Sequence, residues 1–121
     1  MKLEEYIERL RILLEQEVIT TKSYEVALEA YNELLKVLNK TEVTQAEMLF
    51  THLPMALTRI NNEYIVEGPV KEIVDEIMNS KHFAIAKSQV DIIEENWGNV
   101  LPQGEKDFLY LHYTTVLDLN L

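Results

Sequence analysis

The stretch SYEVALEAYNELLKVL, residues 23–38, decides the fold class of this chain. Its apolar side chains recur every three or four residues, which places them together on one face of an α-helix. That face consists of Tyr24, Ala27, Leu28, Tyr31, Leu34, Leu35 and Leu38. We expect the hydroxyl of Ser23 to cap the start of this helix, and residues 39–41 to form the turn after it.

The helical period continues on both sides of this stretch. Before it, residues 3–16 have the spacing of an amphipathic helix. After it, Thr44 and Glu47 have the spacing of a capping box, so we expect a third helix to start there and run towards Asn61. The Asn61–Asn62 pair and Gly68 bound a short connection to the next helix.

Three more helices are predicted in the second half of the chain. Pro69 is suited to be the first residue of a fourth helix, whose inward side chains would be Val70, Ile73, Val74 and Ile77. A fifth helix carries Phe83, Ala86, Val90, Ile93 and Trp97. Gly98 ends it, and a sixth helix runs from about Gly104 to Asp118. Because no stretch has a convincing strand pattern, we predict an all-α fold, a compact bundle of five to six helices.

Composition excludes several classes of protein. The 121 residues are 47% apolar and 26% charged, which suits one globular domain. The formal charge of -10 argues against a nucleic-acid binder, since Lys and Arg supply most of that affinity. There is no cysteine, no signal peptide at the N-terminus and no apolar segment of the ~20 residues that span a bilayer. We therefore expect a cytoplasmic protein that binds neither nucleic acid nor membrane.

Two histidines lie within apolar helical patterns. His52 belongs to FTHLPMALTRI, residues 50–60, where Pro54 removes the helical hydrogen bond to the carbonyl of Phe50. The helix either bends at Pro54 or restarts there, and a restart would leave His52 near free amide groups that attract anions. Arg59, two turns after His52, could help to hold such an anion. The alternative is a hydrogen-bonded histidine at the edge of the core.

The second histidine, His112, belongs to EKDFLYLHYTTVL, residues 105–117, and follows Glu105 by two helical turns. It too could be a histidine at the edge of the core. His82 precedes a predicted helix and is expected to be a surface or capping side chain.

Enzyme machinery is not predicted from these residues. The chain has no HExxH spacing, no two histidines one turn apart, no GxSxG elbow and no glycine-rich phosphate loop. We expect no catalytic residues, no cofactor and no metal ligands. A small helical hydrolase or metal-binding bundle is retained only as a remote alternative.

The two histidine segments together resemble the PTS regulation domain, or PRD, of bacterial sugar antiterminators and activators. LFTHLPMALTR, residues 49–59, resembles the first histidine motif of the family. HFAIAKSQVDIIEENWGNVLP, residues 82–102, resembles its middle segment. PQGEKDFLYLH, residues 102–112, resembles the second histidine motif. The resemblance covers about residues 23–116, with the motifs in the family's order.

The resemblance implies a bundle of about five helices that usually dimerises and is phosphorylated on histidine. His52 and His112 match the family's phosphoacceptors, which receive phosphoryl groups from HPr or a sugar-specific IIB protein. Arg59 matches the arginine after the first acceptor, and Glu105 the glutamate before the second, so both are expected to support the site. Residues 21–121 would form the PRD-like domain, and residues 1–20 an additional helix within the same globular unit.

Three departures from the family pattern bear on function. Thr51 stands where the family commonly has an aspartate, and Asp107 stands where it commonly has a glycine. Residues 113–115 replace the family's usual tail of small residues. An Asp107 carboxylate close to His112 would disfavour a phosphoryl group there, so we expect His52 to be the better acceptor.

The resemblance further implies a standalone regulator of carbohydrate-related transcription or metabolism. No RNA-binding or helix-turn-helix segment is recognised, so it would act through an unidentified protein partner. The competing hypothesis is a helical interaction module without phosphotransfer.

Overall fold

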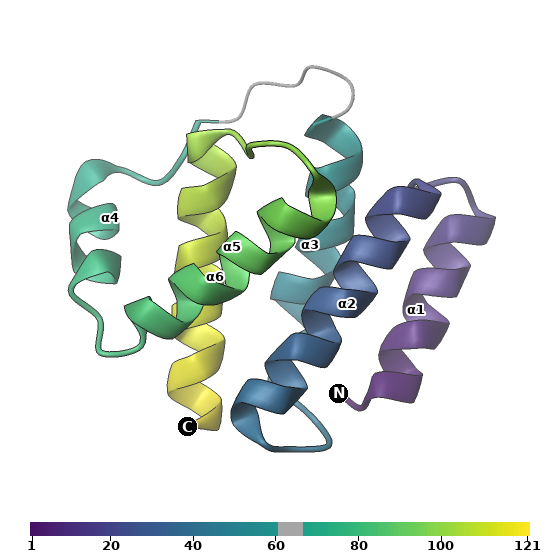
Figure 1. Cartoon of the computed structure of the whole chain (residues 1–121), viewed down its shortest axis with the longest axis horizontal. Helices are drawn as coiled ribbons and strands as arrows, with labels where there is room; N and C mark the ends of the chain where they lie inside the picture. Colours follow the sequence, from purple (N-terminus) through teal and green to yellow (C-terminus); the bar gives the residue numbers. More distant parts are fainter. Residues whose placement is uncertain (61–66) are drawn as a thin grey trace.

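A computed structural model describes residues 1–60 and 67–121. The helices in these ranges are α1 (Leu3–Glu15), α2 (Thr21–Leu38), α3 (Glu47–Ile60), α4 (Lys71–Met78), α5 (Phe83–Trp97) and α6 (Gln103–Asn120). The described ranges hold no strand, only one isolated bridge between Lys2 and Glu42. The predicted all-α bundle is therefore confirmed (Figure 1). The expected turn at Asn61 and Asn62 lies outside the described residues.

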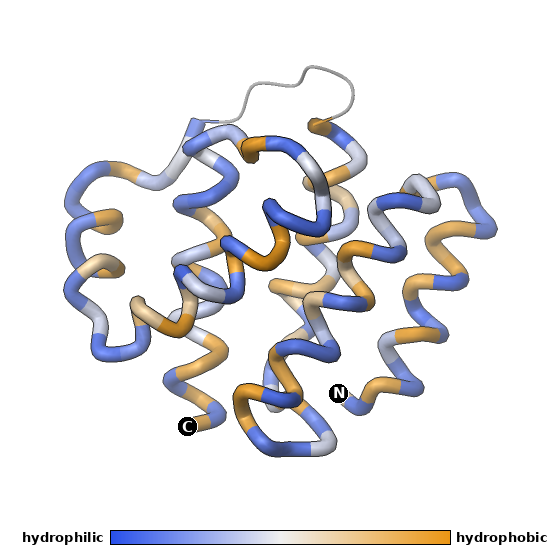
Figure 2. The backbone as a smooth tube through the Cα atoms, viewed as in Figure 1, coloured by the Kyte–Doolittle hydropathy of each residue, from blue (hydrophilic) through white to orange (hydrophobic). Residues whose placement is uncertain are grey.

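Helix α2 occupies the centre of the bundle. It packs against α1, α3 and α5, while α6 packs against α3 and α5 and carries α4 on its outer side (Figure 1). Polar and apolar residues alternate along the helices, as the predicted stripes require (Figure 2). None of the helices in the described part of the chain is long and apolar enough to cross a membrane.

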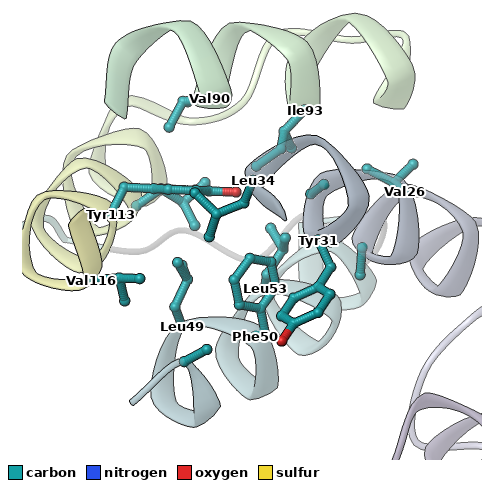
Figure 3. Close-up of a cluster of buried hydrophobic side chains, with 14 of the residues drawn as sticks. Val26, Tyr31, Leu34, Leu49, Phe50, Leu53, Val90, Ile93, Tyr113 and Val116 are labelled. Atoms are coloured by element: carbon teal, nitrogen blue, oxygen red, sulfur yellow. The ribbon is translucent and has the colours of Figure 1, made fainter. Parts of the chain in front are cut away.

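The core joins α2, α3, α5 and α6 around an aromatic cluster (Figure 3). Figure 3 shows Tyr31 and Leu34 of α2, Phe50 of α3 and Tyr113 of α6 pointing into the same space. The Phe50 ring meets Tyr31 edge-on with ring centroids 4.8 Å apart, and Tyr113 at 6.2 Å. All four side chains are fully buried. Because Phe50 precedes His52 by two residues, this cluster fixes one face of the helix that carries His52.

The start of α2 differs from the prediction. The N-cap is Thr20, whose hydroxyl oxygen accepts a hydrogen bond from the backbone N–H of Ser23 at 3.1 Å. Ser23 itself is buried in the first turn. Thr20 has the extended backbone that a capping residue needs, so the prediction chose the wrong one of two nearby hydroxyl residues. The predicted end of α5 is correct, because Gly98 has a φ of 86° and stops the helix.

The predicted capping box at the start of α3 is also wrong. The helix begins at Glu47, and Gln45 has a positive φ of 53°, which breaks the helical path after Thr44. The backbone of Thr44 is held instead by the side chain of Asn120, at the end of α6. The Asn120 amide accepts from the Thr44 N–H at 2.8 Å and donates to the Thr44 carbonyl at 3.0 Å.

Replacing Asn120 with alanine should therefore lower the free energy of unfolding by about 1–3 kcal/mol, since it removes several hydrogen bonds that join the end of α6 to Thr44. Asn120 is only 5% exposed and also donates to the carbonyl of Val116. Urea denaturation measures the change. Asn96→Ala, at an exposed position of α5, is the matched control and should change stability by less than about 0.5 kcal/mol. Equal effects of the two substitutions would contradict the assigned role of Asn120.

Helix α4 is the least enclosed helix. It starts at Lys71 with Val70 as its N-cap, so Pro69 precedes the helix instead of opening it. Only Ile77 is buried, whereas Val70 and Ile73, predicted to face inward, are exposed. The prediction was wrong because α4 packs chiefly on α6, and a single neighbour covers only a narrow strip of a helix.

Candidate functional site

His52 and Arg59 lie on the same side of α3, two turns apart, as their spacing predicts. The helix is continuous from Glu47 to Ile60 and passes through Pro54. The hypothesis of a restart at Pro54 is therefore wrong, and His52 lies in the second turn instead of near free N-terminal amides. Its side chain is 26% exposed, so the ring is partly accessible from solvent.

Glu105 joins these two residues across the helix interface. It lies in the first turn of α6, and its side chain is 1% exposed. One carboxylate oxygen, Oε2, is 3.3 Å from Nε2 of His52, and the other, Oε1, is 3.7 Å from Nη2 of Arg59. The N-terminus of α6 favours a negative charge and the C-terminus of α3 a positive one, so the helix dipoles support this arrangement.

The charge of Glu105 determines how His52 is protonated. The hydrogen bond with His52 lowers the pKa of Glu105 despite the opposing effect of burial, and the nearby Arg59 lowers it further. Glu105 is therefore a carboxylate at neutral pH and can only accept hydrogen bonds. The proton between the two groups then belongs to Nε2 of His52, which leaves the lone pair of a neutral ring on Nδ1.

His112 lies beside His52, although the two come from different helices. Their ring centroids are 5.5 Å apart. Burial and the neighbouring His52 both lower the pKa of His112, so this ring is neutral at pH 7. The ring of Phe108, one turn before His112, lies 6.5 Å from that of His52. The structure thus brings together all four of the predicted site residues, His52 and Arg59 of α3 and Glu105 and His112 of α6.

The residues that depart from the family pattern have other neighbours than the paired rings in the structure. Thr51 is exposed and lines a shallow hollow with Arg9, Ile12 and Leu13 of α1. Asp107 accepts a hydrogen bond from Gln103 at 2.9 Å. Tyr113 is part of the buried core.

The preference for His52 over His112, which rested on repulsion between Asp107 and a phosphoryl group on His112, stays a prediction.

His82 does not join this group, and it lies at the start of α5 as predicted. It is the residue before α5, but its side chain makes no capping hydrogen bond and is only 14% exposed. Its Nε2 lies 3.5 Å from a carboxylate oxygen of Asp118 on α6. Within residues 1–60 and 67–121, no cluster of three or more histidine and acidic side chains is arranged to hold a metal ion.

One contact to the histidine-bearing helix was not predicted. The hydroxyl of Tyr6, on α1, donates a hydrogen bond of 2.8 Å to the carbonyl of Phe50. The signal for it was Pro54, because proline leaves that carbonyl without its helical donor and a buried carbonyl needs a partner. Which residue provides the replacement could not be read from the sequence.

A comparison with family models gives a match to the PRD domain over residues 42–116. The match spans more than half of the chain and contains His52, Arg59, Glu105 and His112. It begins after α2, so the part of the predicted resemblance before residue 42 lies outside it. No curated protein and no solved structure matches the chain.

Proposed function

Because the chain belongs to the PRD domain family, a family of PTS-regulatory type, we propose that His52 and His112 are phosphoacceptors that report phosphotransferase flux. The donor is HPr or a sugar-specific IIB protein. The phosphorylated chain regulates carbohydrate-related transcription or metabolism through contact with another protein. Supporting this proposal, the fold brings both motif histidines to one place, with their ring centroids 5.5 Å apart.

The buried carboxylate of Glu105 prepares His52 for phosphoryl transfer. It holds the proton on Nε2, so the lone pair of Nδ1 attacks the phosphorus of the donor in line. A new N–P bond forms while the bond from phosphorus to the donor breaks, and the donor atom leaves with the electron pair. The phosphorylated ring keeps its Nε2 proton, and the carboxylate of Glu105 compensates the positive charge that the imidazole acquires. No catalytic base is needed for this attack, since the lone pair on Nδ1 carries no proton that must first be removed.

Arg59 is the supporting cation of this proposal. Its guanidinium contacts Glu105 and is 39% exposed, which leaves part of it at the surface near His52. A phosphoryl group brings roughly -1.5 to -2 charges and strong acceptor oxygens. Arg59 can exchange part of its contact with Glu105 for those oxygens, because a planar guanidinium binds phosphate well.

The output of this chemistry is a change in association. The chain already carries a formal charge of -10, so an added dianion at the surface of α3 and α6 repels other acidic surfaces and attracts basic ones. We propose that the phosphoryl group shifts a homodimer equilibrium or the binding of a regulatory protein partner.

Phosphorylation can be tested with the purified chain, phosphoenolpyruvate, enzyme I and HPr, with and without a IIB protein. Intact mass should show an acid-labile phosphoryl group on the wild-type chain. In a short incubation, His52→Ala should remove most of it, and the double variant with His112→Ala should remove all of it. His82→Ala is the matched control and should leave uptake unchanged. No adduct with any donor would reject the proposal in favour of an interaction module, and an adduct on the double variant would reject the site.

A further inference from the structure

Pro54 removes one backbone hydrogen bond from α3, and a side chain of another helix replaces it. Proline has no N–H, so the carbonyl of Phe50, four residues earlier, loses its helical hydrogen bond, at a cost of up to ~3 kcal/mol in a helix interior. Both Phe50 and Pro54 are buried, which keeps water from that carbonyl. An unpaired carbonyl at Phe50 would destabilise the turn of α3 that runs from Phe50 to Pro54, and His52 lies in the middle of that turn.

The repair comes from Tyr6 of α1. Its hydroxyl donates to the Phe50 carbonyl at 2.8 Å, and the side chain is 2% exposed. The ring is fixed on two sides, since its centroid lies 5.3 Å from that of Phe50 and 4.7 Å from that of Tyr31. Burial raises the pKa of Tyr6, so the hydroxyl keeps the proton that it donates.

We propose that Tyr6 is a positioning residue for His52, which acts by taking the place of the backbone donor that Pro54 removes. Its helix, α1, lies wholly outside the residues matched by the PRD family model. The chain would thus depend on an element beyond the matched region to hold its first phosphoacceptor. This inference rests on the proposed function insofar as His52 receives a phosphoryl group.

The geometry explains why the Phe50 carbonyl matters to His52. Residues 50–54 form the turn that carries His52, and the orientation of that carbonyl sets the path of the turn. The His52 ring must stay 3.3 Å from Glu105 of α6 to keep its proton on Nε2. Even a small displacement of α3 relative to α6 would break this contact, since hydrogen bonds weaken steeply with distance and angle.

A double-mutant cycle tests the link between Tyr6 and Pro54. Tyr6→Phe should raise the equilibrium constant of unfolding roughly tenfold, because the Phe50 carbonyl becomes unpaired. In the Pro54→Ala background the new N–H of residue 54 satisfies that carbonyl, so Tyr6→Phe should cost only about twofold. Urea denaturation of the four chains measures the coupling. Equal costs of Tyr6→Phe in the two backgrounds would overturn the proposal.

The effect on His52 is tested with Tyr31→Phe as the matched control. Tyr31 lies in the same aromatic cluster, and its hydroxyl donates to the carbonyl of Met1 instead of to α3. Tyr6→Phe should shift the imidazole resonances of His52 in NMR spectra and slow phosphoryl uptake several-fold, whereas Tyr31→Phe should change neither. If the two variants gave the same spectra and rates, Tyr6 would be only a core residue and the proposal would fail.

These readouts separate this proposal from the proposed function. A wild-type chain that takes up no phosphoryl group would overturn phosphorylation of His52. The stability cycle and the imidazole resonances need no donor protein, so they would still decide whether Tyr6 positions the ring.

Discussion

A chain that carries a phosphoryl group on His52 is expected to accept no second one on His112. Each phosphoryl group brings roughly -1.5 to -2 charges, and the two rings lie 5.5 Å apart. Two such groups at about that separation repel each other by about 3–10 kcal/mol, depending on how much water lies between them. Arg59 contributes only one positive charge, less than the negative charge of a single phosphoryl group, so it cannot offset this repulsion.

Intact mass of the chain after prolonged incubation with excess donor measures this exclusion. The wild-type chain should show one phosphoryl group and almost no doubly modified species. His52→Ala and His112→Ala chains should each take up one group on the histidine that remains, although at different rates. Abundant double modification of the wild type would show that the rings move apart or recruit further cations on phosphorylation, and the single-site interpretation would be wrong.

The fold could be predicted from the sequence because the helical stripes are regular. Ala27, Tyr31 and Leu34 of the predicted stripe of α2 are fully buried, although the buried face also includes Val26 and Ala30, which the prediction left out. Helix ends were harder, since Thr20 and Ser23 offer the same hydroxyl chemistry and only the backbone conformation separates them. The number of helices that pack against α4 determines which of its residues are buried. The local spacing of apolar residues does not predict that number.

The sequence indicated which residues belong to the candidate site, but not how those residues are arranged in space. Family resemblance identified His52 and His112, and spacing placed Arg59 and Glu105 two turns from them. That Glu105 would lie between His52 and Arg59 depends on the crossing of α3 and α6, which is a tertiary contact. The role of Tyr6 could not be predicted for the same reason. Pro54 shows from the sequence that the carbonyl of Phe50 lacks its helical donor, but the sequence does not show which residue donates to it instead.

Glu105→Gln is expected to lower the free energy of unfolding by about 1–3 kcal/mol at neutral pH, the range for a buried hydrogen bond to a charged group. The substitution keeps the size of the side chain and removes its charge, which weakens the contacts with His52 and Arg59. Both partners are partly exposed, so water compensates some of the loss. Glu95→Gln, on the exposed side of α5, is the matched control and should change stability by less than about 0.5 kcal/mol.

The dependence of this loss on pH identifies its cause. The pKa of Glu105 in the native state lies below its ordinary value of 4.5, so the native state binds fewer protons than the unfolded chain around that pH. The carboxylate therefore stabilises the fold above pH 4.5, and this contribution disappears as the pH falls through the native-state pKa. Wild type and Glu105→Gln should thus approach equal stability in acid. His112, whose pKa lies below 6.5, also destabilises the native state on acidification, but it is present in both chains and cancels to first order. A stability difference that stayed constant from neutral pH into acid would show that shape, and not charge, makes Glu105 necessary.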